Sequence, residues 1–142
     1  MYFCCELKIK IMNKVLVVGI SILMLWMTSC SSPESKLEGT WKVKKVETNF
    51  DEQKVSPETL KQVVEMQKEM YFRFLNDTAM VIISNDNTHE AKWKFDEDDN
   101  TIYFYFPGME TSPTKLGVYL DNEIVAEANT PLGKITIIYE KQ

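Results

Sequence analysis

Short segments in which apolar and polar residues alternate dominate the chain beyond residue 36. A period of two places successive side chains on opposite faces of a strand, so each segment predicts a half-buried β-strand. Residues 90–95 show the pattern most clearly, with Ala91, Trp93 and Phe95 on one face and two lysines on the other. The eight predicted strands cover residues 37–46, 71–75, 79–83, 90–95, 101–106, 115–120, 123–128 and 134–139.

The connections between these segments are mostly brief and polar. Asn76-Asp77, Asp121-Asn122 and 131–133 are turn signals between neighbouring strands. Evenly spaced strands joined in this way favour an antiparallel meander, and closure into a barrel removes its exposed edges. The sequence therefore predicts an all-β fold, an eight-stranded antiparallel up-and-down barrel.

One segment between the first and second strands has a helical period instead. In residues 56–70, the apolar residues Leu60, Val63, Val64 and Met70 fall on one stripe. Ser56-Pro57 is a typical helix start, with a serine cap followed by a proline in the first turn. We expect one amphipathic helix here, which buries its stripe against the barrel mouth or against an outer barrel face.

Composition limits the function classes. A chain of 142 residues with 44% hydrophobic residues suits one domain. Its 16 basic and 21 acidic residues give a net charge of −5, which disfavours nucleic-acid binding. One histidine and three cysteines make a zinc centre or a framework of several disulfides unlikely on composition alone.

The start of the chain is typical of an exported protein. A basic start at Met12-Asn13-Lys14 is followed by an apolar run over residues 15–27, which at 13 residues is too short to span a bilayer. We therefore interpret residues 1–29 as a signal peptide. Translation begins at Met12, or residues 1–11 form an extended basic region; the sequence leaves both open.

Met27-Thr28-Ser29-Cys30 resembles the bacterial lipobox, in which the cysteine is lipidated and becomes the mature N-terminus. Met27 stands where leucine is commonest. The resemblance implies a lipid anchor on Cys30, a tether over residues 30–36 and a barrel domain over residues 37–142. Ser31, where aspartate favours inner-membrane retention in enterobacteria, implies the outer membrane, on its periplasmic or its cell-surface side.

Removal of the signal peptide leaves a more acidic protein. Residues 1–29 contain three lysines and one glutamate, so the rest has 13 basic and 20 acidic residues and a net charge of −7. Such a body has no electrostatic attraction to anionic lipid. We therefore expect the acyl chains alone to hold it at the membrane.

Gly39-Thr40-Trp41 opens the first predicted strand and resembles the Gly-x-Trp signature of lipocalins. With the lipobox and eight strands, the chain is similar to small lipocalin-like lipoproteins of the calycin type, frequent in Bacteroidetes. The resemblance implies a tryptophan that plugs one end of the barrel and a barrel that binds a small molecule. The helix after the first strand departs from the usual open loop of that family.

Catalysis and metal binding find little support in the sequence. His89, in the polar segment 84–90, is a solvated histidine or a general base aided by Asp86 or Glu90. No nucleophile, zinc or phosphate-loop motif is present. The acidic run 96–100 lacks the glycine of a calcium-binding loop. We therefore predict that it forms a polar hairpin tip or a weak cation site. We expect no enzyme activity, no cofactor and no resident metal.

The aromatic residues are the remaining candidates. The inward-facing aromatic side chains either line a cavity for an apolar ligand or fill the core. The candidate ligand-binding residues are Trp41, Phe72, Phe74, Trp93 and Phe104. Phe95 and Phe106 are also predicted on inner faces. Tyr103 and Tyr105 share the opposite face of their strand, and Tyr119 is expected to extend that face as a contact patch, unless the helix covers it.

The sequence thus predicts a non-catalytic envelope lipoprotein that binds a small apolar ligand. The alternative is a structural or interaction lipoprotein that binds a protein or a glycan through the exposed aromatic face.

Overall fold

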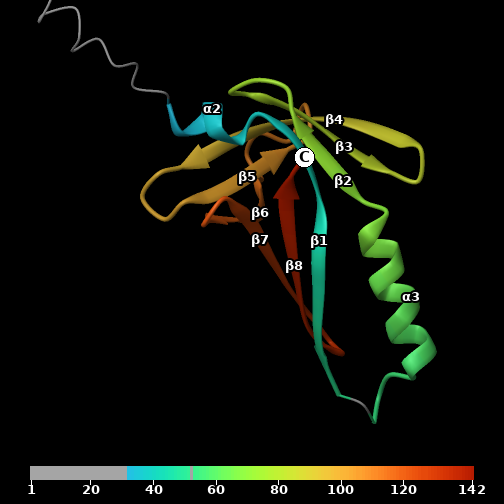
Figure 1. Ribbon diagram of the computed structural model, residues 1–142. Coiled ribbons are helices and arrows are strands. Elements are labelled where there is room, and N and C mark those ends of the chain that lie inside the picture. Colours follow the sequence, from blue (N-terminus) through green and yellow to red (C-terminus); the bar gives the residue numbers. More distant parts are fainter. Residues whose placement is uncertain (1–31, 52) are drawn as a thin grey trace, which may run out of the picture. The chain divides into compact units, whose positions relative to one another are not determined.

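The computed structural model describes residues 32–51 and 53–142 (Figure 1). The predicted signal peptide and the predicted lipid site Cys30 lie outside the described residues. The described residues form two helices and eight strands, in this order: α2 (Pro33–Leu37), β1 (Gly39–Phe50), α3 (Pro57–Lys68), β2 (Tyr71–Phe74), β3 (Ala79–Ser84), β4 (Asn87–Asp96), β5 (Thr101–Tyr105), β6 (Thr114–Leu120), β7 (Glu123–Thr130) and β8 (Gly133–Lys141).

The predicted up-and-down barrel is confirmed. Each strand pairs antiparallel with the next, and β1 pairs with β8 to close the cylinder. The β1–β8 pairing is long and runs from Trp41 opposite Lys141 to Phe50 opposite Gly133. Closure satisfies the backbone groups that an open sheet would leave exposed at its edges.

Two hairpins turn on residues with positive φ. Asn85 and Asp86 have φ of 47° and 66°, and Asp121 and Asn122 have φ of 51° and 64°. A two-residue hairpin turn of type I′ has both central residues in this conformation, which asparagine and aspartate adopt more readily than most other side chains. At the β2–β3 turn, the Asn76 side-chain oxygen instead accepts the backbone N–H groups of Thr78 and Ala79 at 3.0 and 2.8 Å.

The predicted helix is α3, and it packs along β1 (Figure 1). The Ser56 hydroxyl accepts the backbone N–H of Thr59 at 3.2 Å, which caps the first turn. β2 is short and covers β1 only from Gly39 to Lys42, so α3 lies where the rest of β1 has no partner on that side. Val63 of α3 contacts the barrel core there.

A second, short helix was not predicted. Residues 33–37, most of which we assigned to the tether, form α2, and Leu37 ends it rather than beginning β1. Leu37 is completely buried, because α2 lies over the end of the barrel at which β1 begins. The Lys141 ammonium donates a hydrogen bond to the Lys36 carbonyl at 3.1 Å and ties α2 to the end of β8.

The core fills the barrel from this end. Its buried apolar side chains come from α2 and from all strands except β6; they are Leu37, Trp41, Phe72, Phe74, Met80, Ala91, Trp93, Ile102, Ile124, Ile135, Ile137 and Tyr139. On β4, Ala91 and Trp93 are buried and Phe95 is half-buried, while the two lysines between them are exposed, as the alternation predicted.

Candidate functional site

Four of the five predicted ligand residues lie in the packed core. Trp41, Phe72, Phe74 and Trp93 are 1–2% exposed. Three of these rings contact one another in a row: the ring centroids of Phe72 and Phe74 are 5.4 Å apart, and those of Phe74 and Trp93 are 4.4 Å apart. Side chains in mutual contact leave little space between them, so these aromatics fill one half of the barrel.

Trp41 closes the barrel end that α2 covers, which we call the closed end. The indole Nε1 of Trp41 donates to the carbonyl oxygen of Leu37 at 2.7 Å, and its ring meets Tyr119 edge-on at 6.1 Å. At the β2–β3 turn on the same end, the indole Nε1 of Trp93 donates to the carbonyl oxygen of Asn76 at 2.8 Å. Both polar atoms are therefore satisfied inside an apolar region.

The opposite end of the barrel, where β1 ends at Phe50, is less tightly covered, and we call it the open end. Ile135 is buried at this end, but six other inward-facing apolar side chains are only partly buried, although they pack against the core: Val46, Phe50, Ile82, Phe104, Leu116 and Ala126. Phe104, the fifth predicted ligand residue, belongs to this group. Its ring contacts Phe106 edge-on at 5.8 Å, and Phe106 is 39% exposed. Apolar inner surface is thus accessible at the open end.

The barrel wall also separates at this end, between β6 and β7. These two strands pair only from Val118 to Leu120, whereas β7 stays paired with β8 along its whole length. An outer pocket of about 490 Å³ lies between the diverging strands; it is lined by Lys115, Val118, Leu120, Val125, Glu127 and Asn129. The inner positions of β7 along this opening carry the small side chains of Ala126 and Ala128.

His89 belongs to β4, not to a turn as the sequence suggested. It pairs with Ile82 of β3, which faces inward, so His89 occupies an inner position near the open end. Its side chain is exposed, as a solvated histidine would be. It has no ion pair or side-chain hydrogen bond among the described residues, and neither Asp86 nor Glu90 forms a dyad with it there.

Tyr103 and Tyr105 lie on the outer face of β5, as predicted. They pair with Lys94 and Lys92 of β4, and the Lys94 ammonium sits 5.4 Å from the centroid of the Tyr103 ring. The helix α3 packs on β1 and not on these strands. The prediction that Tyr119 extends the same face is wrong: Tyr119 packs against the core, edge-on to Trp41 and Phe95.

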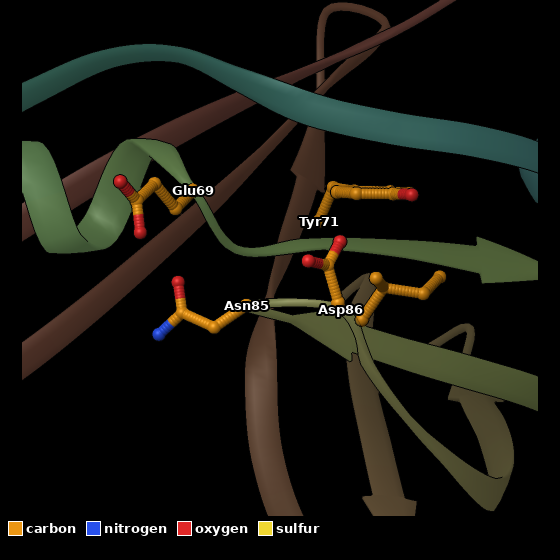
Figure 2. A pocket seen from close by; sticks show the side chains of 5 residues that line it. Glu69, Tyr71, Asn85 and Asp86 are labelled. Carbon is orange, nitrogen blue, oxygen red and sulfur yellow. The ribbon is translucent and has the colours of Figure 1, made fainter.

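A further pocket lies outside the barrel, between the end of α3 and the β3–β4 turn. It has a volume of about 370 Å³ and is lined by Glu69, Tyr71, Ile83, Asn85 and Asp86. Figure 2 shows Glu69 and Asn85 at one side of this pocket, with Tyr71 and Asp86 at the other. Lys42 of β1 lies 5.4 Å from the centroid of the Tyr71 ring. The pocket is polar and carries two carboxylates, so it suits an apolar ligand less well than the open end does.

The acidic run forms the tip of the β4–β5 hairpin, as expected. Its carboxylates bind the turn itself: Asp96 accepts the backbone N–H of Asp98 at 3.1 Å, and Asp99 accepts that of Thr101 at 3.0 Å. Among residues 32–51 and 53–142, no three His, Cys, Asp or Glu side chains come together as metal ligands. Within the same ranges, no helix has both the length and the hydropathy to cross a membrane.

No family model matches this chain, and neither curated proteins nor solved structures gave a match.

Proposed function

We propose that this protein is a non-catalytic envelope lipoprotein, similar to lipocalins, whose barrel binds a small apolar ligand at its open end. The observation that carries the proposal is the change in burial along the inner face. Trp41 and Phe72 are almost fully buried near the closed end, whereas the apolar residues at the open end, such as Phe104, are partly exposed. Exposed apolar surface on a concave wall is what a ligand of this class covers.

The composition of the open end supports an apolar ligand. Phe50, Ile82, Phe104 and Leu116 supply aliphatic and aromatic surface from four different strands. Burial of such surface contributes about 25 cal/mol per Å². His89 is the one titratable side chain at an inner strand position there among the described residues, and it can orient a polar group of the ligand.

The binding test compares two tryptophan substitutions on neighbouring residues of β7. Ala128 pairs with the inward-facing Ile135, so Ala128→Trp places an indole inside the open end. Asn129 lies on the outer face, so Asn129→Trp adds the same side chain outside. Residues 32–142 form one compact unit that contains the whole barrel and its core. This segment is therefore the protein used in the assay.

Two readouts are used. Native mass spectrometry of the segment, incubated with an extract of the envelope of the producing organism, is expected to show a mass excess of one small molecule. Titration with anilinonaphthalene sulfonate is expected to give a bound, fluorescent state that Ala128→Trp abolishes and Asn129→Trp retains. A bare polypeptide mass, together with equal probe binding by both variants, would overturn the proposal.

The membrane anchor is tested separately. We propose that Cys30 carries the lipid and holds the acidic domain at the outer membrane through its acyl chains alone. Labelled palmitate is expected to enter the full-length chain, and Cys30→Ser is expected to abolish labelling and release the protein into the soluble fraction. Cys4→Ser with Cys5→Ser is the matched control. Labelling that persists in Cys30→Ser would contradict the anchor.

A further inference from the structure

The outer face of β4, β5 and β6 carries two rows of lysine and tyrosine. In one row, Lys94 of β4 pairs with Tyr103 of β5, and Tyr103 pairs with Lys115 of β6. In the next row, Lys92 pairs with Tyr105. Paired residues on one face stand about 5 Å apart, so these five side chains form one continuous surface. We call it the lysine–tyrosine face.

This face is positive on a protein that is negative overall. Elsewhere in the described part of the chain, Lys44, Lys45, Lys54, Lys68 and Lys134 form ion pairs with carboxylates. Lys92, Lys94 and Lys115 form none with the described residues. Three lysines without ion pairs among the described residues, gathered on one face of an acidic domain, attract a negatively charged partner to that face.

The acidic groups around the face are engaged elsewhere or stand at its border. Glu110, in the loop after β5, accepts the backbone N–H of Gly108 at 3.1 Å. Bonds from backbone N–H groups, including its own and that of Gly108, lower the pKa of Glu110, and the charge of Lys92 lowers it slightly further. On β4, Glu90 lies beyond Lys92, and Asp96, which lies beyond Lys94, accepts a backbone N–H of the hairpin tip.

The tyrosines give the face its second property. Tyr103 and Tyr105 are half-buried, so each ring rests partly on its neighbours and leaves the remainder accessible. Lys94 stands over the Tyr103 ring, which keeps a cation beside an aromatic surface. A phenol also offers both a hydrogen-bond donor and an acceptor.

Within the part of the chain that the structure describes, this face carries no large apolar side chain, apart from its two tyrosines, that could anchor a protein partner. Large exposed apolar side chains of the described residues lie at other positions: Met66, Leu75, Phe106, Met109, Leu120 and Leu132. Protein interfaces concentrate their binding energy in Trp, Tyr and Arg anchors that fill pockets, whereas Tyr103 and Tyr105 lie half-buried on the surface of a sheet. A shallow sheet surface of phenols and ammonium groups instead suits the flat faces and acid groups of a sugar polymer.

We propose that the lysine–tyrosine face binds an acidic polysaccharide. The tyrosine rings pack against the C–H faces of the sugar rings, and the three lysines pair with the carboxylate or phosphate groups. Three strands of the sheet span about 10 Å, and two residues along a strand span about 7 Å, so the face covers a short stretch of the polymer. This surface lies on the outside of the barrel and shares only Lys115 with the outer pocket between β6 and β7, and the proposal does not depend on the apolar ligand.

The test measures binding of residues 32–142 to polygalacturonate, with neutral dextran as the uncharged polymer. The triple variant Lys92→Gln, Lys94→Gln, Lys115→Gln is expected to lose about tenfold in affinity. The control variant Lys44→Gln, Lys45→Gln, Lys134→Gln has the same net charge and is expected to change affinity less than about twofold. Equal losses in the two variants would show that net charge alone attracts the polymer, and would overturn the proposal.

A second variant tests the rings. Tyr103→Ala with Tyr105→Ala keeps every charge and is expected to weaken binding by about tenfold while the fold is retained, as circular dichroism checks. Vesicles that contain phosphatidylglycerol provide the other anionic surface. Binding to these vesicles but not to polygalacturonate would contradict the proposal, as would dextran binding equal to that of the acidic polymer.

Discussion

The indole nitrogen of Trp41 donates a 2.7 Å hydrogen bond to the carbonyl oxygen of Leu37, four residues earlier in the chain. This bond joins the first strand of the barrel to the last residue of α2, and both residues are buried. It satisfies a carbonyl at the C-terminus of the helix, where the groups lack helical partners. The closed end is therefore held by a side chain of the Gly39-Thr40-Trp41 triplet.

Trp41→Phe tests this link. The phenyl ring keeps most of the apolar contact, but the Leu37 carbonyl loses its donor, so we expect a loss of about 1–3 kcal/mol in the free energy of unfolding. The measurement is urea unfolding together with hydrogen exchange of the amides in residues 33–37.

Trp93→Phe is the matched control, because Trp93 makes the corresponding bond to Asn76 at 2.8 Å. It is expected to cost a similar free energy without faster exchange in α2. Unchanged exchange of α2 in Trp41→Phe would contradict the assigned role of the bond.

Tyr139 makes the stability of the barrel depend on alkaline pH. Burial raises the pKa of its phenol from 10.0 to about 12. The folded state favours the neutral phenol. The contribution of Tyr139 to the free energy of unfolding is therefore complete below pH 10 and is lost as the pH rises towards 12. The difference amounts to about 3 kcal/mol.

Tyr139→Phe is therefore expected to remove part of the loss in unfolding free energy between about pH 9 and pH 12. Tyr103→Phe, at a half-buried tyrosine on the outer face, is the control and is expected to keep the wild-type dependence. Urea unfolding at several pH values checks both, and identical pH profiles for wild type and Tyr139→Phe would refute the prediction.

Gly117 marks a close approach of β6 to β7. A Cβ atom at this position would lie 2.7 Å from the backbone oxygen of Val125. The neighbouring atom is backbone, so Gly117→Ala must displace a strand, and we expect a loss of about 1–3 kcal/mol in unfolding free energy.

Gly108→Ala is the comparison. No atom lies within 4 Å of a Cβ there, but φ is +86°, so only backbone strain applies. That strain is expected to cost about 1 kcal/mol. Denaturant unfolding that ranks Gly108→Ala as the more damaging change would contradict the argument from the β6–β7 contact.

Ser56 caps α3 through the Thr59 N–H. Ser56→Ala is expected to cost about 1 kcal/mol of helix stability and to speed hydrogen exchange in the first turn of α3. Ser112→Ala, in an exposed loop, serves as the control. Equal protection of the first turn in wild type and Ser56→Ala would show that packing against β1 alone holds the helix.

The strand pattern and the turns could be predicted because alternation and positive-φ residues are local signals. The inner aromatics Phe72 and Trp93 were assigned to the correct face for the same reason. Tyr119 was assigned to the wrong face because of one extra residue. Ile102 pairs with Gly117 but Tyr103 pairs with Lys115, so a bulge at residue 116 shifts the alternation of β6 and turns Tyr119 inward.

The position of the candidate site along the barrel could not be read from local patterns. Which aromatics are packed and which are accessible depends on the end that α2 covers, and α2 is held there by contacts with Trp41 and Lys141. The Lys141–Lys36 contact joins residues far apart in the chain. The Trp41–Leu37 contact is local in sequence, but it depends on the burial of both residues in the folded protein. Alternation tells only which way a side chain faces.

Packing is tighter at the closed end of the barrel than at the open end. The residues that stabilise the fold are therefore largely different from the residues that form the open rim. Substitutions near the closed end remove mutual contacts of Trp41, Phe72 and Phe74 and so reduce the stability of the whole fold. Substitutions among the partly buried side chains at the open end remove less buried surface and so reduce that stability less. The open rim of this barrel can therefore diverge in sequence while the packed closed end stays unchanged.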